Sequence, residues 1–425
     1  MADERTALRS AAGPLALVAL VTAGCGMERG TTAESQTSKA AMSAHGLAVS
    51  PTWYRDVQPI VQSRCIGCHT AGGIAPFPLT SYADAFAQYQ TIGAAVQTRR
   101  MPPWPPADGC QPLRDARRLE PAEVDTIVAW SIGGAEAGDP AEAPPAVSPP
   151  GGLTSVDARL DPGVDYLPQS NLAGHPHDDY HCFALDPGLT QDRDLVGLEI
   201  LPGQPSLVHH VLLFTASPEA ARAADDAEAG PGWTCFGGPG VSGLPATVGG
   251  WAPGSGATRS PEGTGIPIAA GSTLVMQVHY NLDHGPPAPD RSIVQLQYAN
   301  GRVPRPARML PIADVTFAIP PGATGYRTTV TFPFAQPATL WGLAPHMHIL
   351  GRHIRVEKDG GCLIDIPAWD FHWQQAYFLR EPLLIPPGSR VTLACTWNNP
   401  TSRTVTWGEG TSDEMCLSYL YLTFP

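Results

Sequence analysis

Short apolar runs between glycine- and proline-containing turns occupy most of the chain beyond residue 155. Runs of about four to eight residues with such boundaries are typical of β-strands. The runs that we predict to be strands are Leu195–Ile200, Leu207–Phe214, Leu274–Tyr280, Ile293–Tyr298, Val315–Phe317, Tyr326–Phe332, Ala338–Leu343, Arg390–Trp397 and Met415–Phe424. The pattern restarts after Pro304, which predicts two β-sandwich domains that divide near residues 302–312.

A helical pattern precedes the strands. The segment 119–133 has apolar residues at the spacing of one helix face, namely Leu119, Val124, Ile127, Val128 and Trp130. The glycines at 133 and 134 then provide a stop signal. We expect this helix to close a small α-helical domain that begins at Trp53.

The N-terminus has the pattern of an export signal. Arg5 and Arg9 precede an apolar run over residues 11–23, which is shorter than the roughly 20 residues that a membrane span needs. Small residues before Cys25 are similar to a bacterial lipoprotein cleavage site, although an ordinary signal peptide with an incidental Cys25 would look alike. We expect a signal peptide over residues 1–25 and an exported, periplasmic or outer-membrane lipoprotein that meets the membrane only through its lipid anchor.

Composition places the remaining boundaries. A small, polar tether is expected over residues 26–52, the helical domain over 53–138 and a stiff proline- and alanine-rich linker over 139–155. The sandwiches would then cover 156–305 and 306–425. The protein is therefore predicted to be mostly β, with two jelly-roll-like sandwiches behind one helical domain.

Charge excludes one class of partner. The 425 residues have a formal net charge of -13, and only 15% of them are charged. No basic run occurs, so we do not expect nucleic acid as a partner.

The sequence Cys65-Ile66-Gly67-Cys68-His69 is a C-x-x-C-H motif, which is the attachment signature of a c-type haem. The thiols of Cys65 and Cys68 would bind the porphyrin and His69 the iron, although a redox or zinc C-x-x-C remains an alternative. Met101 would be the sixth ligand, because no other methionine or histidine lies between His69 and the domain end. Its alternative role is packing beside a proline-rich loop.

A second candidate centre is H-M-H, with His346 and His348 two residues apart in the expected strand 343–351. Residues i and i+2 of a strand share a face, so both imidazoles can approach one metal while Met347 points away. Imidazole suits zinc, copper, iron and nickel, so the pair does not name the metal. Two exposed histidines on one strand face are the simpler alternative.

A third candidate centre combines His209 and His210 with His279 in another apolar run. Neighbouring residues of a regular strand point to opposite faces, so His209 and His210 can share a metal only if the strand bulges, ends or twists. His279 could instead be a hydrogen-bonded core histidine.

Beyond the linker the chain resembles the copper type II, ascorbate-dependent monooxygenases, the family of the peptidylglycine and dopamine β-monooxygenases. Four ordered motifs are the basis: V-H-H-V-L-L-F, L-V-M-Q-V-H-Y-N, H-M-H-I-L-G-R and S-D-E-M-C-L-S-Y. The resemblance implies two sandwiches that each hold one copper ion across a solvent-filled cleft. The ligands would be His209, His210 and His279 at one site, and His346, His348 and Met415 at the catalytic site. A thioether is a soft ligand that favours Cu(I).

The resemblance also implies two disulfides, Cys182–Cys235 and Cys395–Cys416, and leaves Cys110 and Cys362 either paired or free. Gln277 and Tyr419 match substrate-contacting positions. Ala344-Pro345 stands where the peptide-processing members have an arginine, and Leu417 replaces an asparagine, so a peptide-glycine substrate is not favoured. Six other histidines would be structural or on the surface, with His372 the nearest to the cleft.

Residues 53–138 thus resemble a small α-helical cytochrome c domain. Together these features predict an exported copper monooxygenase with two copper ions and one covalent haem c. It would hydroxylate a C–H bond of a small molecule or peptide with O2, and take electrons from ascorbate, a redox protein or its own haem domain. A non-catalytic haem and copper electron-transfer or copper-binding protein is the main alternative. A zinc hydrolase is disfavoured, because the methionine ligand does not suit it.

Overall fold

The computed structural model describes residues 50–71, 75–145, 152–170, 174–253 and 255–425. The expected signal peptide, the lipidation site Cys25 and nearly all of the tether lie outside these residues. The chain divides into Met1–Leu47 and Ala48–Pro425, so every described residue belongs to the second unit. No helix among the described residues is long and apolar enough to cross a membrane.

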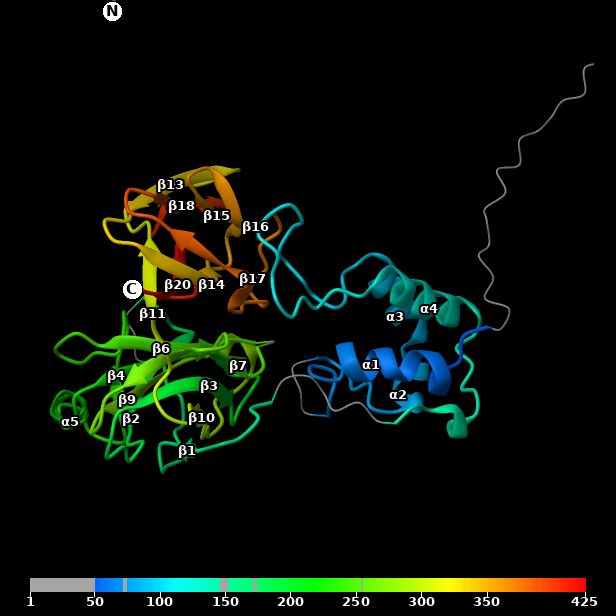
Figure 1. Ribbon diagram of the computed structural model, residues 1–425, viewed down its shortest axis with the longest axis horizontal. Helices are drawn as coiled ribbons and strands as arrows, with labels where there is room; N and C mark the ends of the chain where they lie inside the picture. The colour runs from blue at the N-terminus through cyan, green and yellow to red at the C-terminus, as the bar shows by residue number, and fades with distance from the viewer. Residues whose placement is uncertain (1–49, 72–74, 146–151, 171–173, 254) are drawn as a thin grey trace, which may run out of the picture. The chain divides into compact units, whose positions relative to one another are not determined.

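The first described part is helical (Figure 1). Its elements are η1 (Trp53–Val57), α1 (Gln58–Arg64), α2 (Tyr82–Ala87), α3 (Tyr89–Gln97), α4 (Pro121–Ile132) and η2 (Pro140–Glu142). The rings of Trp53 and Trp130 lie 5.8 Å apart in its core, beside the fully buried Ile127. The predicted closing helix is confirmed as α4, and Gly133 is its C-cap.

The first sandwich packs two sheets against each other (Figure 1). One sheet has the strand order β5 (Trp233–Thr234), β2 (Asp178–Leu185), β9 (Thr273–Asn281), β4 (Val208–Ala216) and β6 (Ala246–Trp251). The other has the order β1 (Ala158–Leu160), β10 (Ile293–Tyr298), β3 (Arg193–Leu201) and β8 (Thr264–Ile268), with β7 (Thr258–Arg259) also paired to β3. The short helix α5 (Pro218–Asp225) follows β4, and η3 (Leu282–His284) follows β9.

The second sandwich has the same plan. One sheet contains β11 (Arg305–Ala313), β20 (Leu417–Thr423), β14 (Ala338–His346) and β17 (Tyr377–Ile385). The facing sheet contains β13 (Tyr326–Pro333), β18 (Arg390–Trp397), β15 (Gly351–Lys358) and β16 (Gly361–Ile366). A separate two-stranded ladder pairs β12 (Ala318–Ile319) with β19 (Val405–Thr406). The predicted mostly β fold is therefore confirmed.

One predicted strand is wrong. Residues 315–317 form no strand, and the chain turns there before β12. The Asp314 carboxylate accepts hydrogen bonds from the backbone N–H and the hydroxyl of Thr316, at 2.9 and 2.8 Å. This local side-chain bonding competes with strand pairing, which the apolar pattern of the segment does not reveal.

The two sandwiches are joined through backbone pairing. Strands β8 and β11 run parallel, with Arg305 opposite Thr264, so one sheet continues from the first sandwich into the second. The Tyr421 hydroxyl adds a side-chain link by donating to Ser260 at 2.9 Å. The sandwiches therefore share a continuous edge, which restricts how far their facing surfaces can separate.

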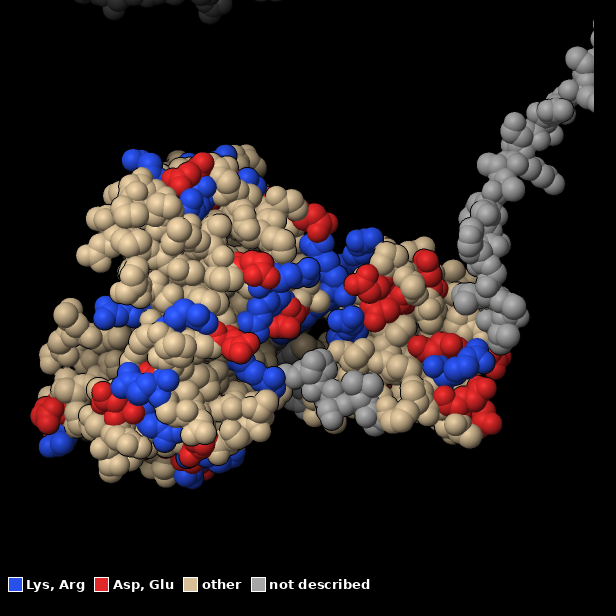
Figure 2. Space-filling model, viewed as in Figure 1, with Lys and Arg blue, Asp and Glu red and all other residues tan. Residues whose placement is uncertain are grey.

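A disulfide between Cys110 and Cys362 joins the segment between α3 and α4 to the second sandwich, at a sequence separation of 252. Beside it, Leu113 forms an antiparallel bridge with Leu379, and the Trp104 ring packs edge-on against Tyr377 at 5.6 Å. The visible face of the molecule has basic and acidic side chains interspersed (Figure 2).

The Cys110–Cys362 disulfide leads to a direct prediction. A protease site inserted between Pro149 and Pro150 should allow the linker to be cut while the two products stay covalently joined. Gel electrophoresis should show one band without reductant and two bands with it. The Cys110→Ser variant is the control and should give two bands under both conditions; one band without reductant for this variant would contradict the pairing.

Candidate metal centres

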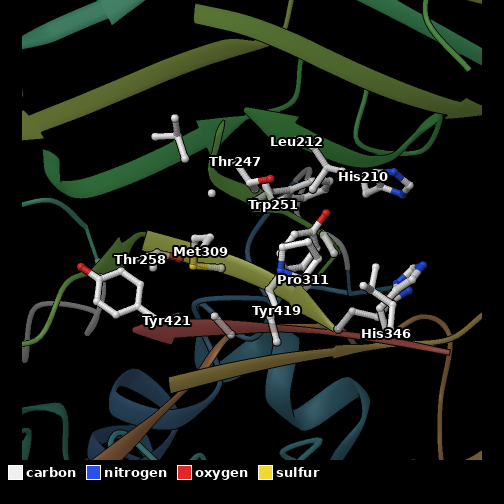
Figure 3. A pocket seen from close by; sticks show the side chains of 18 of the residues that line it. His210, Leu212, Thr247, Trp251, Thr258, Met309, Pro311, His346, Tyr419 and Tyr421 are labelled. Atoms are coloured by element: carbon white, nitrogen blue, oxygen red, sulfur yellow. The ribbon is translucent and has the colours of Figure 1, made fainter. Parts of the chain in front are cut away.

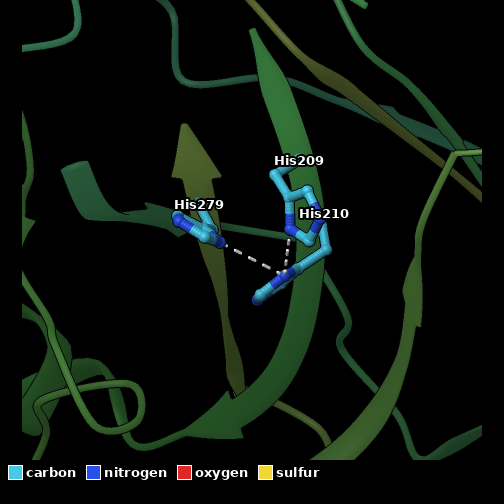
Figure 4. Close-up of side chains that lie close together, drawn as sticks. All are labelled: His209, His210 and His279. Atoms are coloured by element: carbon cyan, nitrogen blue, oxygen red, sulfur yellow. Dashed lines mark hydrogen bonds between the residues drawn. The ribbon is translucent and has the colours of Figure 1, made fainter. Parts of the chain in front are cut away.

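The first cluster of histidines arises from a bulge in β4. The pairing of β4 with β9 shifts register between Val208 and His210, so that His210 lies opposite His279. The bulge satisfies the condition that the sequence set for His209 and His210 to serve one metal. Their Nδ1 atoms lie 3.2 Å apart, and the Nδ1 of His279 lies 3.4 Å from that of His210 (Figure 4).

This spacing fits a shared metal ion. Two imidazole nitrogens that each bind one ion at about 2.0–2.1 Å are separated by roughly 3 Å. The ligand atoms of all three histidines lie within 4.8 Å of one another. Burial, with added repulsion between neighbouring imidazoles, lowers the pKa of His209 and His210 well below the ordinary value. The rings are therefore neutral and keep a lone pair for a metal.

His279 is held from behind by two residues of β2. Its Nε2–H donates to the Asp178 carboxylate at 2.8 Å, which leaves Nδ1 as the free lone pair. The Tyr180 ring stacks on the imidazole with centroids 4.0 Å apart and planes 12° apart. Burial acts to raise the pKa of Asp178, but hydrogen bonds from His279 and Thr411 outweigh it, and the pKa lies below its ordinary value.

The second cluster lies at the end of β14. His346 is the last residue of the strand, and its ring lies 5.1 Å from that of His348. The Nδ1 of His346 donates to Gln374 Oε1 at 2.5 Å, and the Nδ1 of His348 donates to the Asp413 carbonyl at 3.1 Å. Each ring therefore keeps the lone pair on Nε2, and burial lowers the pKa of His346 to about 4.

The expected continuous strand over 343–351 is wrong, although its main consequence holds. β14 stops at His346, and the chain turns through His348 instead of extending the ladder. The buried Glu414 carboxylate causes the turn, because it accepts from the backbone N–H groups of His348 at 3.1 Å and Leu350 at 2.5 Å. Met347 points away from the cluster into the second core, as predicted.

Met415 lies beside this turn. It stands two residues before Leu417, which lies opposite His346 in the β14–β20 register. Met415 is buried and lines the same cavity as His346. The adjacent Cys416 is bonded to Cys395, and the structure also forms Cys182–Cys235, the two disulfides that the family resemblance implies.

Glu414 was not predicted from the sequence, although it stands inside the quoted S-D-E-M-C motif. It is fully buried and also accepts from the indole N–H of Trp397 at 2.8 Å. Burial raises its pKa to about 7, although these hydrogen bonds act to lower the pKa. Its hydrogen bonds fix the turn that carries His348, and Glu414 itself directly precedes Met415 in the chain.

The two clusters lie against each other. The rings of His210 and His346 are 6.3 Å apart, and Phe371 stacks on His209 at 4.2 Å while lying 6.0 Å from His348. Side chains thus occupy the space between the clusters, where the family resemblance implied a solvent-filled cleft.

The open space lies to one side of the clusters. A cavity of about 420 Å³ reaches both sandwiches and includes His210, His346 and Met415 in its lining (Figure 3). Much of its wall is aromatic, formed by Trp251, Phe378, Trp407, Tyr419 and Tyr421. Among the described residues that line it, Glu409 is the only Asp, Glu, Lys or Arg.

Both predicted substrate residues lie in this lining. Gln277 is buried and donates through Nε2 to the carbonyls of Cys235 at 2.9 Å and Gly238 at 2.8 Å. Its Oε1 has no partner in the described part of the chain. Gln277 is therefore held rigidly with one acceptor atom left for a ligand.

His372 was expected to be the unassigned histidine nearest the cleft, but its side chain is 67% exposed and lies beside Asp370. The flanking residues Phe371 and Gln374 contact the clusters instead. His175 lies close to Asp178 and Asp413 at the contact between the sandwiches.

The C-x-x-C-H segment follows α1. Cys65 and Cys68 are not in disulfides, and burial raises the pKa of Cys65 to about 12. The buried His69 donates through Nδ1 to the Phe77 carbonyl at 2.9 Å, which leaves Nε2 for an iron ion. The three residues therefore fit a covalently bound haem. Met101 lies half-buried four residues after α3, and its role as an axial ligand stays a prediction.

Comparison with known proteins finds a family model that matches the second sandwich. Residues 313–423 match the family model described as the copper type II ascorbate-dependent monooxygenase, C-terminal domain. This part of the chain is therefore similar to the C-terminal domain of the copper type II monooxygenases.

The chain is also similar to individual monooxygenases and hydroxylases. It is 25% identical to tyramine beta-hydroxylase of Caenorhabditis briggsae over 58% of this chain and 43% of that protein. It is 26% identical to DBH-like monooxygenase protein 1 of Homo sapiens, over 63% of this chain and 48% of that protein. It is 27% identical to dopamine beta-hydroxylase of Bos taurus, over 40% of this chain and 32% of that protein. The chain spans less than half the length of each of these relatives.

Replacing Gln374 tests how the second cluster is held. The Gln374→Leu variant removes the acceptor behind His346, so we expect about 10–100-fold weaker Cu(I) binding at that cluster. Competition with a Cu(I) chelator measures this. The Gln375→Leu variant is the matched control, and equal losses in the two variants would contradict the role of Gln374.

Proposed function

We propose that this protein is an exported copper monooxygenase that hydroxylates a C–H bond of a small molecule with O2. The main support is that two sets of buried, neutral imidazoles meet beside one cavity, and that one set includes a thioether. Bound copper would supply one-electron chemistry and the activation of dioxygen. Three disulfides among the described residues agree with an oxidising compartment.

The residues of the chain divide the remaining work. His209, His210 and His279 would hold one copper ion, while His346, His348 and Met415 would hold the catalytic one. All five imidazoles have a lowered pKa through burial, so no proton must leave before a metal binds. The soft sulfur of Met415 would favour the reduced state of the second site.

The helical part would hold haem c through Cys65, Cys68 and His69, with Met101 as the sixth ligand. Covalent attachment to the same chain makes this haem a candidate one-electron donor. Ascorbate, the reductant in the name of the matching family, is the second candidate donor.

The substrate class follows from the cavity. Aromatic walls favour an apolar body, and Glu409 offers a carboxylate to a cationic group. Burial and the nearby Asp413 charge raise the pKa of Glu409 to about 7. No lysine or arginine is found among the described lining residues, so a substrate carboxylate would lack a counter-charge. Two relatives are named for amines, tyramine and dopamine, and we propose an amine here as well.

Turnover tests the proposed activity. The copper-loaded protein should consume O2 and form hydroxylated product in equal amounts when tyramine is supplied with a reductant. His348→Ala should abolish turnover without altering the haem spectrum, and Met415→Ile should weaken Cu(I) binding more than Cu(II) binding. Normal hydroxylation by both variants would refute the copper ligands. Copper binding without product from a panel of amines would favour the non-catalytic alternative, and two bound zinc ions would favour a hydrolase.

Glu409 gives a separate prediction about pH. Below pH 7 its carboxyl becomes protonated and loses its attraction for an amine, so kcat/KM for tyramine should fall there and level off above pH 7. The Glu409→Gln variant should raise KM about tenfold or more and should lose this pH dependence. A neutral analogue of the same shape should show neither effect, and an unchanged KM for tyramine would refute the role of Glu409.

A further inference from the structure

The loop before Met415 crosses from the second sandwich onto strand β2 of the first. Its residue Thr411 donates to the Asp178 carboxylate twice, through the hydroxyl at 2.6 Å and the backbone N–H at 3.0 Å. Two further contacts accompany this one. The Tyr180 hydroxyl donates to the Glu409 carbonyl, and a Cβ added to Gly410 would lie 2.0 Å from the His175 ring. The loop is therefore closely fitted to β2.

The same residues of β2 also hold the first metal cluster. Asp178 accepts from His279 Nε2 through Oδ1, the oxygen that also accepts from the Thr411 hydroxyl. Tyr180 stacks on the His279 ring while its hydroxyl reaches the loop. Asp178 is buried, so neither hydrogen bond competes freely with water.

The far end of the loop reaches the second cluster directly. The Asp413 carbonyl accepts from His348 Nδ1, Glu414 fixes the turn of His348, and Met415 follows. An unbroken series of contacts thus leads from His279 through Asp178 and Thr411 to the proposed ligands of the second metal. Glu409, whose carboxylate we propose to bind the amine group of the substrate, is part of the same loop.

We propose that Asp178 and Thr411 are positioning residues that couple the two metal centres, so that metal at the first cluster tightens metal binding at the second. A metal ion on His279 Nδ1 polarises the ring and strengthens its Nε2–H as a donor to Asp178. It also fixes the position of the carboxylate, which in turn fixes the loop that carries Met415. Coupling between binding sites is reciprocal, so metal at the second cluster tightens the first by the same factor. This inference rests on the proposed function only in requiring both clusters to bind copper, and it requires no turnover.

Copper binding to the full-length, haem-loaded chain tests the proposal. Cu(I) affinity of the second cluster is measured by chelator competition, first with the first cluster filled and then in the His209→Ala variant, which cannot fill it. We expect affinity to be about fivefold or more tighter with the first cluster filled. The Thr411→Val variant should reduce this factor to about one, while the first cluster, measured with the second cluster empty, keeps its affinity and its Cu(II) paramagnetic resonance spectrum.

The Thr411→Ser variant is the matched control, because it keeps the hydroxyl and should keep the coupling. A purely structural role of Thr411 would lower both affinities together and would not be restored by serine. Wild-type coupling in Thr411→Val, or no coupling in the wild type, overturns the inference. If Thr411→Val does not fold, Thr411→Ala replaces it, since it also removes the hydroxyl that donates to Asp178. Absence of copper from both clusters would refute the proposed function itself, a result distinct from two filled but uncoupled sites.

Discussion

The hydrogen bonds behind the histidines decide which nitrogen each ring presents to a metal. A neutral imidazole has one lone pair, and the nitrogen that carries it is the one without the proton. The Nε2–H of His279 donates to Asp178, so this ring presents Nδ1, whereas the Nδ1–H groups of His346 and His348 donate to Gln374 and Asp413 and leave Nε2. The folds of both sandwiches serve to place these three acceptors, since the ligand types alone would allow either orientation.

Local pattern was sufficient for most of the strands and for the two pairs of neighbouring histidines. The strand Ile293–Tyr298 has the predicted boundaries, and the bulge beside His209 and His210 was the condition that their spacing imposed. The H-M-H pair was correctly predicted to come together, with Met347 buried behind it. Strand boundaries and the placing of nearby histidines depend on residues close in the sequence, so the periodicity of apolar residues can predict them.

The acceptors and packing partners of the clusters could not be predicted in this way. Glu414 causes the turn that ends β14, although it lies 66 residues after His348 and 64 residues after Leu350 in the sequence. Asp178 and Gln374 act on histidines 101 and 28 residues distant. The packing of Phe371 on His209 joins two domains. Each of these contacts exists only after the sandwiches have formed, so no local sequence signal precedes it.

The partly buried Cys65 has a consequence for how such a chain matures. Disulfide exchange proceeds through the thiolate, and burial raises the pKa of Cys65 to about 12, so this thiol is almost wholly protonated near neutral pH. Six other cysteines are paired in the structure, in an environment that must therefore oxidise thiols. The low thiolate fraction of Cys65 thus slows disulfide exchange at this residue. Oxidative folding of the two sandwiches can therefore proceed in the same compartment while the Cys65 thiol is preserved.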